Sequence, residues 1–402
     1  MQIPFASSER SSLGVEWELQ LVDRQSRELT AGATEILAEI RPDGAEEHPK
    51  AKHELLQSTV EVITGVCTTV EEATADLAAT VAEVAAAADR RGLGLLCAGT
   101  HPFTDWQTQL ISPKERYLQL VERMQWMARR LQIFGVHVHV GVRSPDKAMP
   151  IVNALTQYVP HFLALSASSP FWVGCDTGLA SARSKVFEGM PTAGLPMQLP
   201  DWAGFEHYME TLVSTGAIES VREVWWDIRP HPGFGTVELR ICDGLPTLEE
   251  VGVVAALSQC LVEQFDHQLD RGYTLPTPPE WVLRENKWRA ARHGLDADVI
   301  DDEKGTVRPV RQALLDLAED LTPIARRLGC ETELAGVERV LAVGASYQRQ
   351  RAAALAADGD LRAVVDGLLA ELADGLPQHP LPTSGSDGPV PGPAACAGGH
   401  AA

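Results

Sequence analysis

Residues 133–142 read Ile-Phe-Gly-Val-His-Val-His-Val-Gly-Val, and this alternation strongly constrains how the chain can fold. Alternating β-branched and polar residues predict a strand with one side in the core. The valines would face the core, and His137 and His139 would lie next to each other on the opposite face. Two adjacent imidazoles can bind a metal ion or a phosphate, or they can be ordinary histidines on a hydrated face. Other residues on that face must decide between these interpretations.

The overall composition narrows the class of protein. The chain has 402 residues, of which 45% are hydrophobic and 22% charged, as in an ordinary globular protein. Its net charge of −21 argues against binding to nucleic acid or to an anionic membrane surface. None of the seven cysteines forms a CxxC pair, and the start of the chain lacks the pattern of a signal peptide. We therefore expect a reduced, cytoplasmic protein without membrane spans.

Strand and helix signals alternate through the first 240 residues, and the last third is helical. Strands are predicted at 13–22, 58–64, 93–98, 133–142, 224–230 and 235–241. Helices are predicted at 30–40, 69–92, 112–131, 148–168, 205–215 and 247–271, and the pattern from 279 to about 372 is helical. Capping boxes are expected at Ser112 with Glu115 and at Thr247 with Glu250. Turn-linked strands favour an α+β fold with a mostly antiparallel sheet covered by helices.

The sequence divides the chain into three parts. Residues 1–10 are polar and predicted to be flexible, 11–374 would form a single domain, and 375–402 are rich in Pro, Gly and Ala and predicted to be disordered. Residues 170–204 show no period, and such long irregular segments are often functional. The chain contains no GxGxxG, GxxxxGK[ST] or GxSxG motif, which disfavours the common nucleotide-binding and hydrolase folds.

Several predicted strands place carboxylates on one face. Glu16 and Glu18 are two residues apart, and their mutual repulsion makes burial costly unless a cation lies between them. A hydrated acidic face is the simpler alternative. Glu61 is a single acid in an apolar strand, and Glu54 precedes that strand across an expected break. Each of these acids therefore needs water or a partner.

The last predicted hairpin adds a mixed set of charges. Thr236, Glu238 and Arg240 share one face of their strand. Glu238 and Arg240 could form a structural ion pair, or the acid could bind a metal while the guanidinium stabilises a phosphoryl group. A face with about five carboxylates and few bases is a poor core and a good site for Mg²⁺ or Mn²⁺. Such ions would clamp the phosphates of a nucleotide.

The chain resembles the bacterial carboxylate–amine ligases of the glutamate–cysteine ligase type 2 family, and most of all its actinobacterial members. The resemblance covers about residues 11–374. Its motifs are the stretches 13–19, 137–141, 183–187, 191–196, 225–230, 238–243, 285–290 and 344–350. It implies a glutamine-synthetase-like catalytic fold, in which a curved, mostly antiparallel sheet forms a funnel with phosphates and metals on its concave face.

The resemblance also implies an activity and roles for individual residues. The family joins a carboxylate, typically the γ-carboxylate of glutamate, to an amine such as that of cysteine, using ATP and Mg²⁺ and forming an acyl phosphate. Weak glutamate–cysteine ligase activity is therefore expected, and a homodimer is compatible with the family. His139, by analogy with glutamine synthetase, and Arg240 would contact the transferred phosphate. By similarity, metal-ligand positions fall at Glu16, Glu18, Glu54, Glu61, His137 and Glu238.

Three further basic residues are candidate contacts for ligands. Arg183, in the irregular segment, is a candidate for the α-carboxylate of the substrate, and Lys287 and Arg289 are candidates for nucleotide phosphate. Two alternatives to a ligase stay open. The first is a metal-dependent amide hydrolase that uses the His/Glu face to activate water. The second is a non-catalytic relative that binds a nucleotide.

Overall fold

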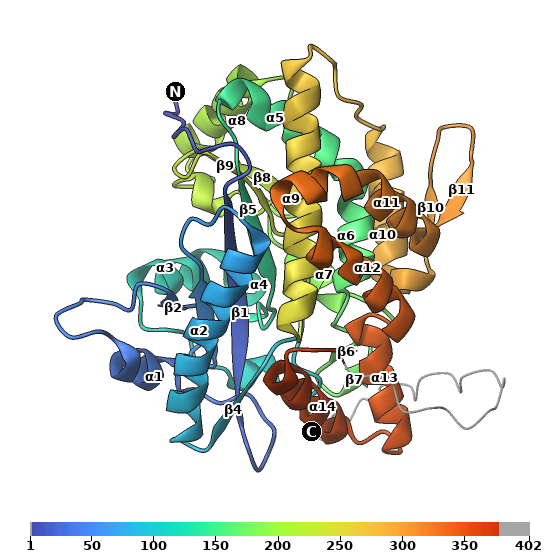
Figure 1. The fold of residues 1–402 in the computed structure, drawn as a ribbon. Helices are drawn as coiled ribbons and strands as arrows, with labels where there is room; N and C mark the ends of the chain where they lie inside the picture. Colours follow the sequence, from blue (N-terminus) through green and yellow to red (C-terminus); the bar gives the residue numbers. More distant parts are fainter. Residues whose placement is uncertain (1, 378–402) are drawn as a thin grey trace.

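The computed structural model describes residues 2–377, and the predicted disorder at 378–402 lies outside the described residues. Its largest sheet has seven strands in the order β2-β3-β1-β5-β9-β8, with β4 also paired to β1, and every pairing is antiparallel. Helices flank this sheet, and the long α9 crosses the middle of the molecule beside it (Figure 1). The predicted α+β class with a mostly antiparallel sheet is confirmed.

The strands of the main sheet are β1 (Leu13–Asp23), β2 (Ala51–His53), β3 (Thr59–Ile63), β4 (Leu93–Leu96), β5 (Val136–Gly141), β8 (Ile228–His231) and β9 (Thr236–Leu239). Two small hairpins lie outside it. They are formed by β6 (Phe171–Trp172) with β7 (Cys175–Asp176) and by β10 (Asp298–Ile300) with β11 (Val307–Pro309).

The α-helices are α1 (Ala33–Ile40), α2 (Val70–Asp89), α3 (Glu115–Met124), α4 (Trp126–Arg129), α5 (Pro145–Leu155), α6 (Val159–Ser166), α7 (Ala182–Phe187), α8 (Trp202–Ser214), α9 (Leu248–Asp270), α10 (Glu280–His293), α11 (Val310–Leu328), α12 (Glu331–Val343), α13 (Ser346–Ala356) and α14 (Leu361–Asp374). Short 3₁₀ turns lie at Trp106–Thr108, Thr156–Tyr158, Val221–Glu223 and Gly294–Asp296.

Helix caps decide several of these boundaries. Thr69 caps α2 in a complete capping box with Glu72, and the Thr247 hydroxyl accepts a hydrogen bond from the Glu250 backbone at the start of α9. The cap predicted at Ser112 is wrong, because α3 begins at Glu115 after an extended Lys114. The backbone at Gln125, with φ of 49°, then divides the predicted helix into α3 and α4.

The core lies between the main sheet and the helices. Val136, Val138 and Val140 of β5 are fully buried in the main hydrophobic cluster, as the alternation predicts. That cluster also takes in most of the apolar side chains of α9, which is buried along most of its length. The packed face of the sheet leaves the opposite face of the same strands for the polar residues.

The N-terminal residues make more contacts than their predicted flexibility suggests. Residues 6–12 run across the end of β5 and the turn between β8 and β9, and the Ala6 amide donates to the Pro232 carbonyl at 2.8 Å. Arg10 binds both carboxylate oxygens of Glu263 at 2.6 and 2.7 Å. Hydrogen bonds of this bidentate kind fix a segment in one orientation. No described helix is long and apolar enough to cross a membrane.

Candidate active site

The register of the sheet brings the predicted polar residues together. Glu16 lies opposite His137, and Glu18 lies opposite Glu61. On the other side of β5, His139 lies opposite Glu238. Paired residues in antiparallel strands project to the same face. Four strands therefore build one polar face, as their alternation predicts.

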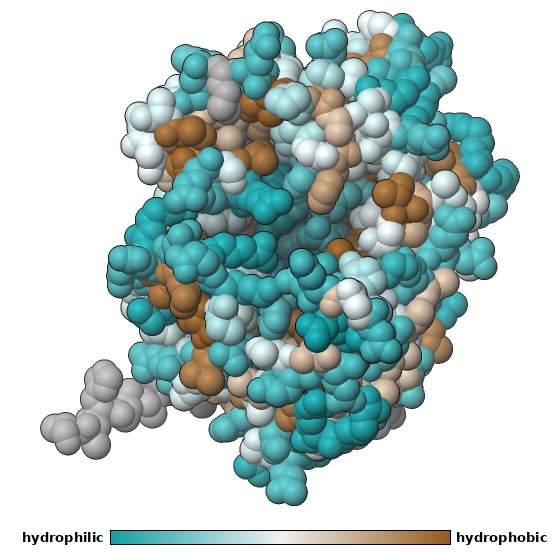
Figure 2. Space-filling model, turned by 90° about the vertical axis from the view of Figure 1, so that its left-hand side faces the viewer, coloured by the Kyte–Doolittle hydropathy of each residue, from teal (hydrophilic) through white to brown (hydrophobic). Residues whose placement is uncertain are grey.

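This face forms one wall of a cavity of about 720 Å³. The cavity is also lined by α3, through Arg116 and Tyr117, and by residues around the β8–β9 hairpin. A recess surrounded largely by hydrophilic atoms is visible on the side of the molecule drawn in Figure 2. Of the predicted residues, the cavity is lined by Glu16, Glu18, Glu54, Glu61, His137 and Arg240.

The two histidines are both bonded to one carboxylate. His137 Nδ1 lies 2.9 Å from Glu16 Oε2, and His139 Nε2 lies 3.2 Å from Glu16 Oε1. Burial opposes ionisation of Glu16, but the hydrogen bonds with these two rings outweigh it and lower its pKa. Burial and the nearby Arg240 charge lower the pKa of His137 to about 4. A neutral His137 keeps a nitrogen lone pair that can bind a metal.

Glu238 is fully buried between two guanidinium groups. Arg229 Nε donates to Glu238 Oε2 at 2.7 Å, and Arg240 Nη1 donates to Glu238 Oε1. Burial would raise the pKa of Glu238, but the charges of Arg229 and Arg240 hold it well below its usual value. The Glu238 carboxylate is therefore ionised. Its hydrogen bond with Arg240 holds that guanidinium group at the cavity wall.

Glu18, Glu54 and Glu61 lack such basic partners. Burial and the Glu54 charge raise the pKa of Glu18 to about 8, although the Gly135 amide donates to its carboxylate. Burial also raises the pKa of Glu54, and burial with the charges of neighbouring glutamates raises that of Glu61 well above its usual value. This part of the face has more negative charge than the protein itself neutralises.

The acidic side chains and His137 are arranged so that they could bind divalent cations. Two sets of side chains, Glu16–His137–Glu238 and Glu18–Glu61–His137, each have ligand atoms within 4.8 Å of one another. His137 is common to both sets. Ligands made mainly of carboxylate oxygen fit Mg²⁺ or Mn²⁺, which complete their shells with water and phosphate. The donor set therefore fits the predicted metal ions. Glu54 lies beside these sets, on the loop after β2.

The other predicted ligand contacts are placed differently. Arg183 is buried beside Gly135, where it donates to the carbonyls of Arg240 and Ile241 at 3.3 Å. Lys287 is buried between Asp227 and Glu188, 2.6 Å from each. In the described structure neither residue lines the cavity. Both basic groups already have protein partners, and the substrate contact of Arg183 and the phosphate contact of Lys287 stay predictions.

Arg289 also points elsewhere. It pairs with Glu285 one turn away on α10 and donates to the Asp298 carbonyl at 3.2 Å, and it does not line the described cavity. Arg229 and Arg116 also line the cavity, although the sequence patterns did not single them out. Arg229 could have been found from the hairpin register, because it lies opposite Glu238. Arg116 gives no such signal, since it comes from a helix on the other side of the cavity.

Comparison with known proteins decides the family. The model of glutamate–cysteine ligase family 2 matches residues 12–367. The chain belongs to this family. A relative from Frankia alni, provisionally named glutamate–cysteine ligase 2-1, is 66% identical over 378 residues, covering 94% of this chain and 99% of the relative. A second, from Thermobifida fusca and provisionally named glutamate–cysteine ligase 2, is 57% identical, covering 94% of each chain.

Solved structures support the fold. A glutamate–cysteine ligase from Francisella tularensis in complex with AMP matches with a TM-score of 0.65 at 12% identity, covering 92% of this chain and 93% of that one. A bifunctional glutathione synthetase from Pasteurella multocida matches with a TM-score of 0.65 at 15% identity, covering 91% of this chain and 53% of that one. The predicted family and its class of enzyme, a ligase, are confirmed.

Proposed function

We propose that this protein is an ATP-dependent carboxylate–amine ligase that joins the γ-carboxylate of glutamate to the amine of cysteine. Its products would be γ-glutamylcysteine, ADP and phosphate. Family membership supports the acid and amine, and relatives of this family carry the corresponding name. The observation that carries the proposal is the convergence of Glu16, Glu18, Glu61 and His137 on one cavity wall beside Arg240. The buried Glu238 carboxylate lies within 4.8 Å of the ligand atoms of Glu16 and His137.

The charges on this wall suit phosphoryl transfer to a carboxylate. A carboxylate is a poor electrophile, and phosphorylation by ATP converts it to an acyl phosphate that an amine can attack. Divalent cations, when bound, would neutralise the phosphate oxygens. Glu16, Glu18, Glu61, His137 and Glu238 would hold these ions.

Arg240 is the residue best placed to stabilise charge on the transferred group. It lines the cavity, and its pairing with Glu238 fixes the direction of the guanidinium. Arg183 also supports Arg240, because it donates to the Arg240 carbonyl. A fixed guanidinium that needs no rearrangement lowers the barrier more than a mobile one. His139 is bonded to Glu16 and to the Thr236 hydroxyl, and its Nε2 lies 3.9 Å from Glu238, the carboxylate that pairs with Arg240. It would contact the same phosphate.

The proposal is tested by following ADP release with acid and amine supplied together and singly. A ligase releases ADP at its full rate only when both substrates are present, and γ-glutamylcysteine accumulates in equal amount. Other pairs of acids and amines, run in parallel, show whether glutamate and cysteine are preferred. Amide cleavage without ATP would instead support a metal-dependent hydrolase.

A further inference from the structure

One pair of aromatic rings in the cavity wall has no part in the chemistry described above. His231, the last residue of β8, and Phe234, in the turn before β9, stack with ring centres 4.1 Å apart and planes 13° from parallel. Both residues line the cavity. The Phe234 side chain is 56% exposed, and among the described residues it is the exposed large apolar side chain that lines this cavity.

The pair packs against His139, the residue that we expect to contact the transferred phosphate. The His139 ring packs edge-on against both rings, with centres 5.5 Å from His231 and 5.6 Å from Phe234. His139 in turn lies beside Glu16 and Glu238. Since Arg240 and both rings line the same cavity, a ligand that contacts Arg240 could extend to this pair.

The fold holds the turn in place from outside the cavity. The Ser8 hydroxyl donates to the Phe234 carbonyl at 2.6 Å, and the Phe234 amide donates to His231 Nδ1 at 3.2 Å. Residue 235 is glycine with φ of 65°, and a Cβ atom there would come within 1.9 Å of the Ala6 carbonyl oxygen. The turn and the N-terminal segment therefore pack too closely for any other residue at this position.

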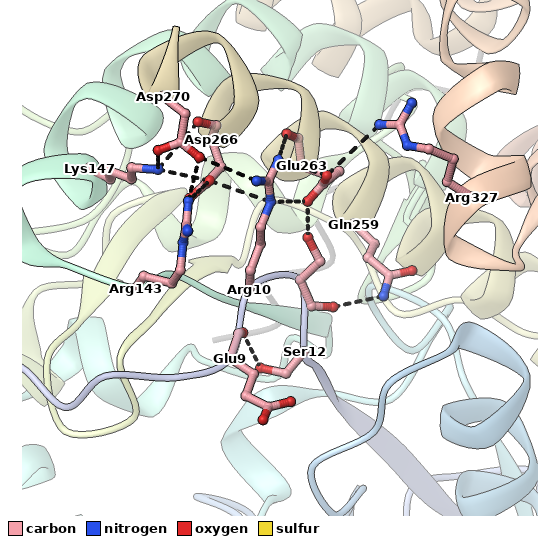
Figure 3. Close-up of polar contacts among 11 residues, drawn as sticks. Glu9, Arg10, Ser12, Arg143, Lys147, Gln259, Glu263, Asp266, Asp270 and Arg327 are labelled. Carbon is pink, nitrogen blue, oxygen red and sulfur yellow. Dashed lines mark hydrogen bonds and ion pairs between the residues drawn. The ribbon is translucent and has the colours of Figure 1, made fainter. Parts of the chain in front are cut away.

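The N-terminal segment is itself firmly attached. Arg10 and Ser11 both bind the Glu263 carboxylate, and Gln259 donates to the Ser11 carbonyl at 2.8 Å (Figure 3). These contacts tie residues 10 and 11 to α9. An aromatic side chain that is left exposed, yet held rigidly, is suited to binding a ligand, since little conformational freedom remains to be lost.

We propose that the stacked His231–Phe234 pair is the surface on which the purine base of the nucleotide lies. A flat base can stack on an exposed aromatic face whatever its hydrogen-bonding pattern. Its phosphate chain would then run past His139 toward Arg240, which places the base and the phosphates on neighbouring parts of one wall. This inference rests on the proposed function, because it takes the nucleotide to be a substrate.

The test measures binding rather than turnover. Calorimetry in Mg²⁺ compares a non-hydrolysable ATP analogue with inorganic tripolyphosphate, which has the charge but no base. Phe234→Ala is expected to weaken binding of the analogue roughly 10-fold or more, from the loss of one stacking contact. Tripolyphosphate binding is expected to stay unchanged. Phe234→Trp should restore binding of the analogue, whereas Trp281→Ala, which removes an exposed aromatic side chain elsewhere, should have no effect.

Two results would overturn the inference about the base but leave the proposed function standing. One is equal affinity of Phe234→Ala and the parent for the analogue. The other is equal weakening of both probes, which would mean that Phe234 only supports the phosphate site. If the parent binds neither probe, the proposed function fails as well. In steady-state assays, Phe234→Ala should raise KM for ATP while KM for the acid and the amine stays the same.

Discussion

Glu18 and Glu61 lie directly opposite each other on the paired strands β1 and β3. Like charges in this position destabilise a sheet. Burial and neighbouring carboxylates raise the pKa of both residues, with that of Glu18 reaching about 8. Repulsion between these carboxylates therefore lowers the stability of the folded protein, and a bound divalent cation would remove this repulsion. Such a loss of stability is expected at a binding site.

The first prediction concerns stability and pH. The pKa of Glu18 is higher in the folded protein than its ordinary value of 4.5, so the folded state holds this proton more tightly than the unfolded state. This group therefore makes the folded protein less stable as pH rises from 4.5 to about 8. Glu18→Gln should unfold at a higher temperature than the metal-free parent, and the difference should grow across that range. Thermal unfolding at several pH values measures it.

Mg²⁺ provides the matching control. It should raise the unfolding temperature of the parent more near the top of that pH range than near the bottom, because the carboxylates must be ionised to bind it. The effect should be smaller for Glu18→Gln. An unchanged difference between variant and parent across the range would mean that Glu18 does not carry this repulsion.

The second prediction concerns the proposed metal ligands. Glu16→Ala and Glu238→Ala should each lower kcat/KM for ligation by roughly 100-fold or more, because each removes a carboxylate from the metal set. Circular dichroism should show that the fold is retained. Glu285→Ala, on the surface of α10, is the control and should keep full activity. Normal rates for both active-site variants at saturating Mg²⁺ and ATP would refute the assignment.

The third prediction concerns Arg240. Arg240→Lys replaces a planar group that is paired with Glu238 by a single ammonium. We expect a large loss in kcat with a small change in KM, because the guanidinium acts mainly in the transition state. Initial rates over a range of each substrate separate the two parameters. A change confined to KM would place Arg240 in substrate binding instead.

The fourth prediction separates two roles for Arg183. In the structure this residue donates to the carbonyls of Arg240 and Ile241, so it would act by positioning Arg240. Arg183→Lys should therefore lower kcat and leave KM for the acid within about twofold of the parent. A rise in KM for the acid alone would support the contact with the substrate carboxylate that the sequence suggests.

Alternation within strands made much of the site predictable. The period of two placed Glu16 with Glu18, and His137 with His139, on single faces, and the structure pairs these strands as neighbours. The burial of the β5 valines and the cap at Thr247 followed in the same way from local sequence. These features depend on residues that are close together in the chain, and sequence patterns predict such local features well.

Features that depend on contacts between distant parts of the chain could not be predicted from the sequence. Arg183 and Lys287 are basic residues near the motifs, but tertiary contacts bury them against Asp243 and Asp227, respectively. The N-terminal segment is polar, yet Arg10 attaches it to a helix 253 residues away. The break at Gln125 likewise comes from tertiary context, because the surrounding sequence has a continuous helical pattern.

The central claim is that ATP activates the carboxylate of the acid, and the fate of an oxygen atom tests it most directly. Glutamate labelled with ¹⁸O in its γ-carboxylate is incubated with cysteine, ATP, Mg²⁺ and the protein, and the released phosphate is analysed by mass spectrometry. Transfer through an acyl phosphate predicts one ¹⁸O atom in each phosphate released. Unlabelled phosphate, with oxygen derived from water, would contradict the account.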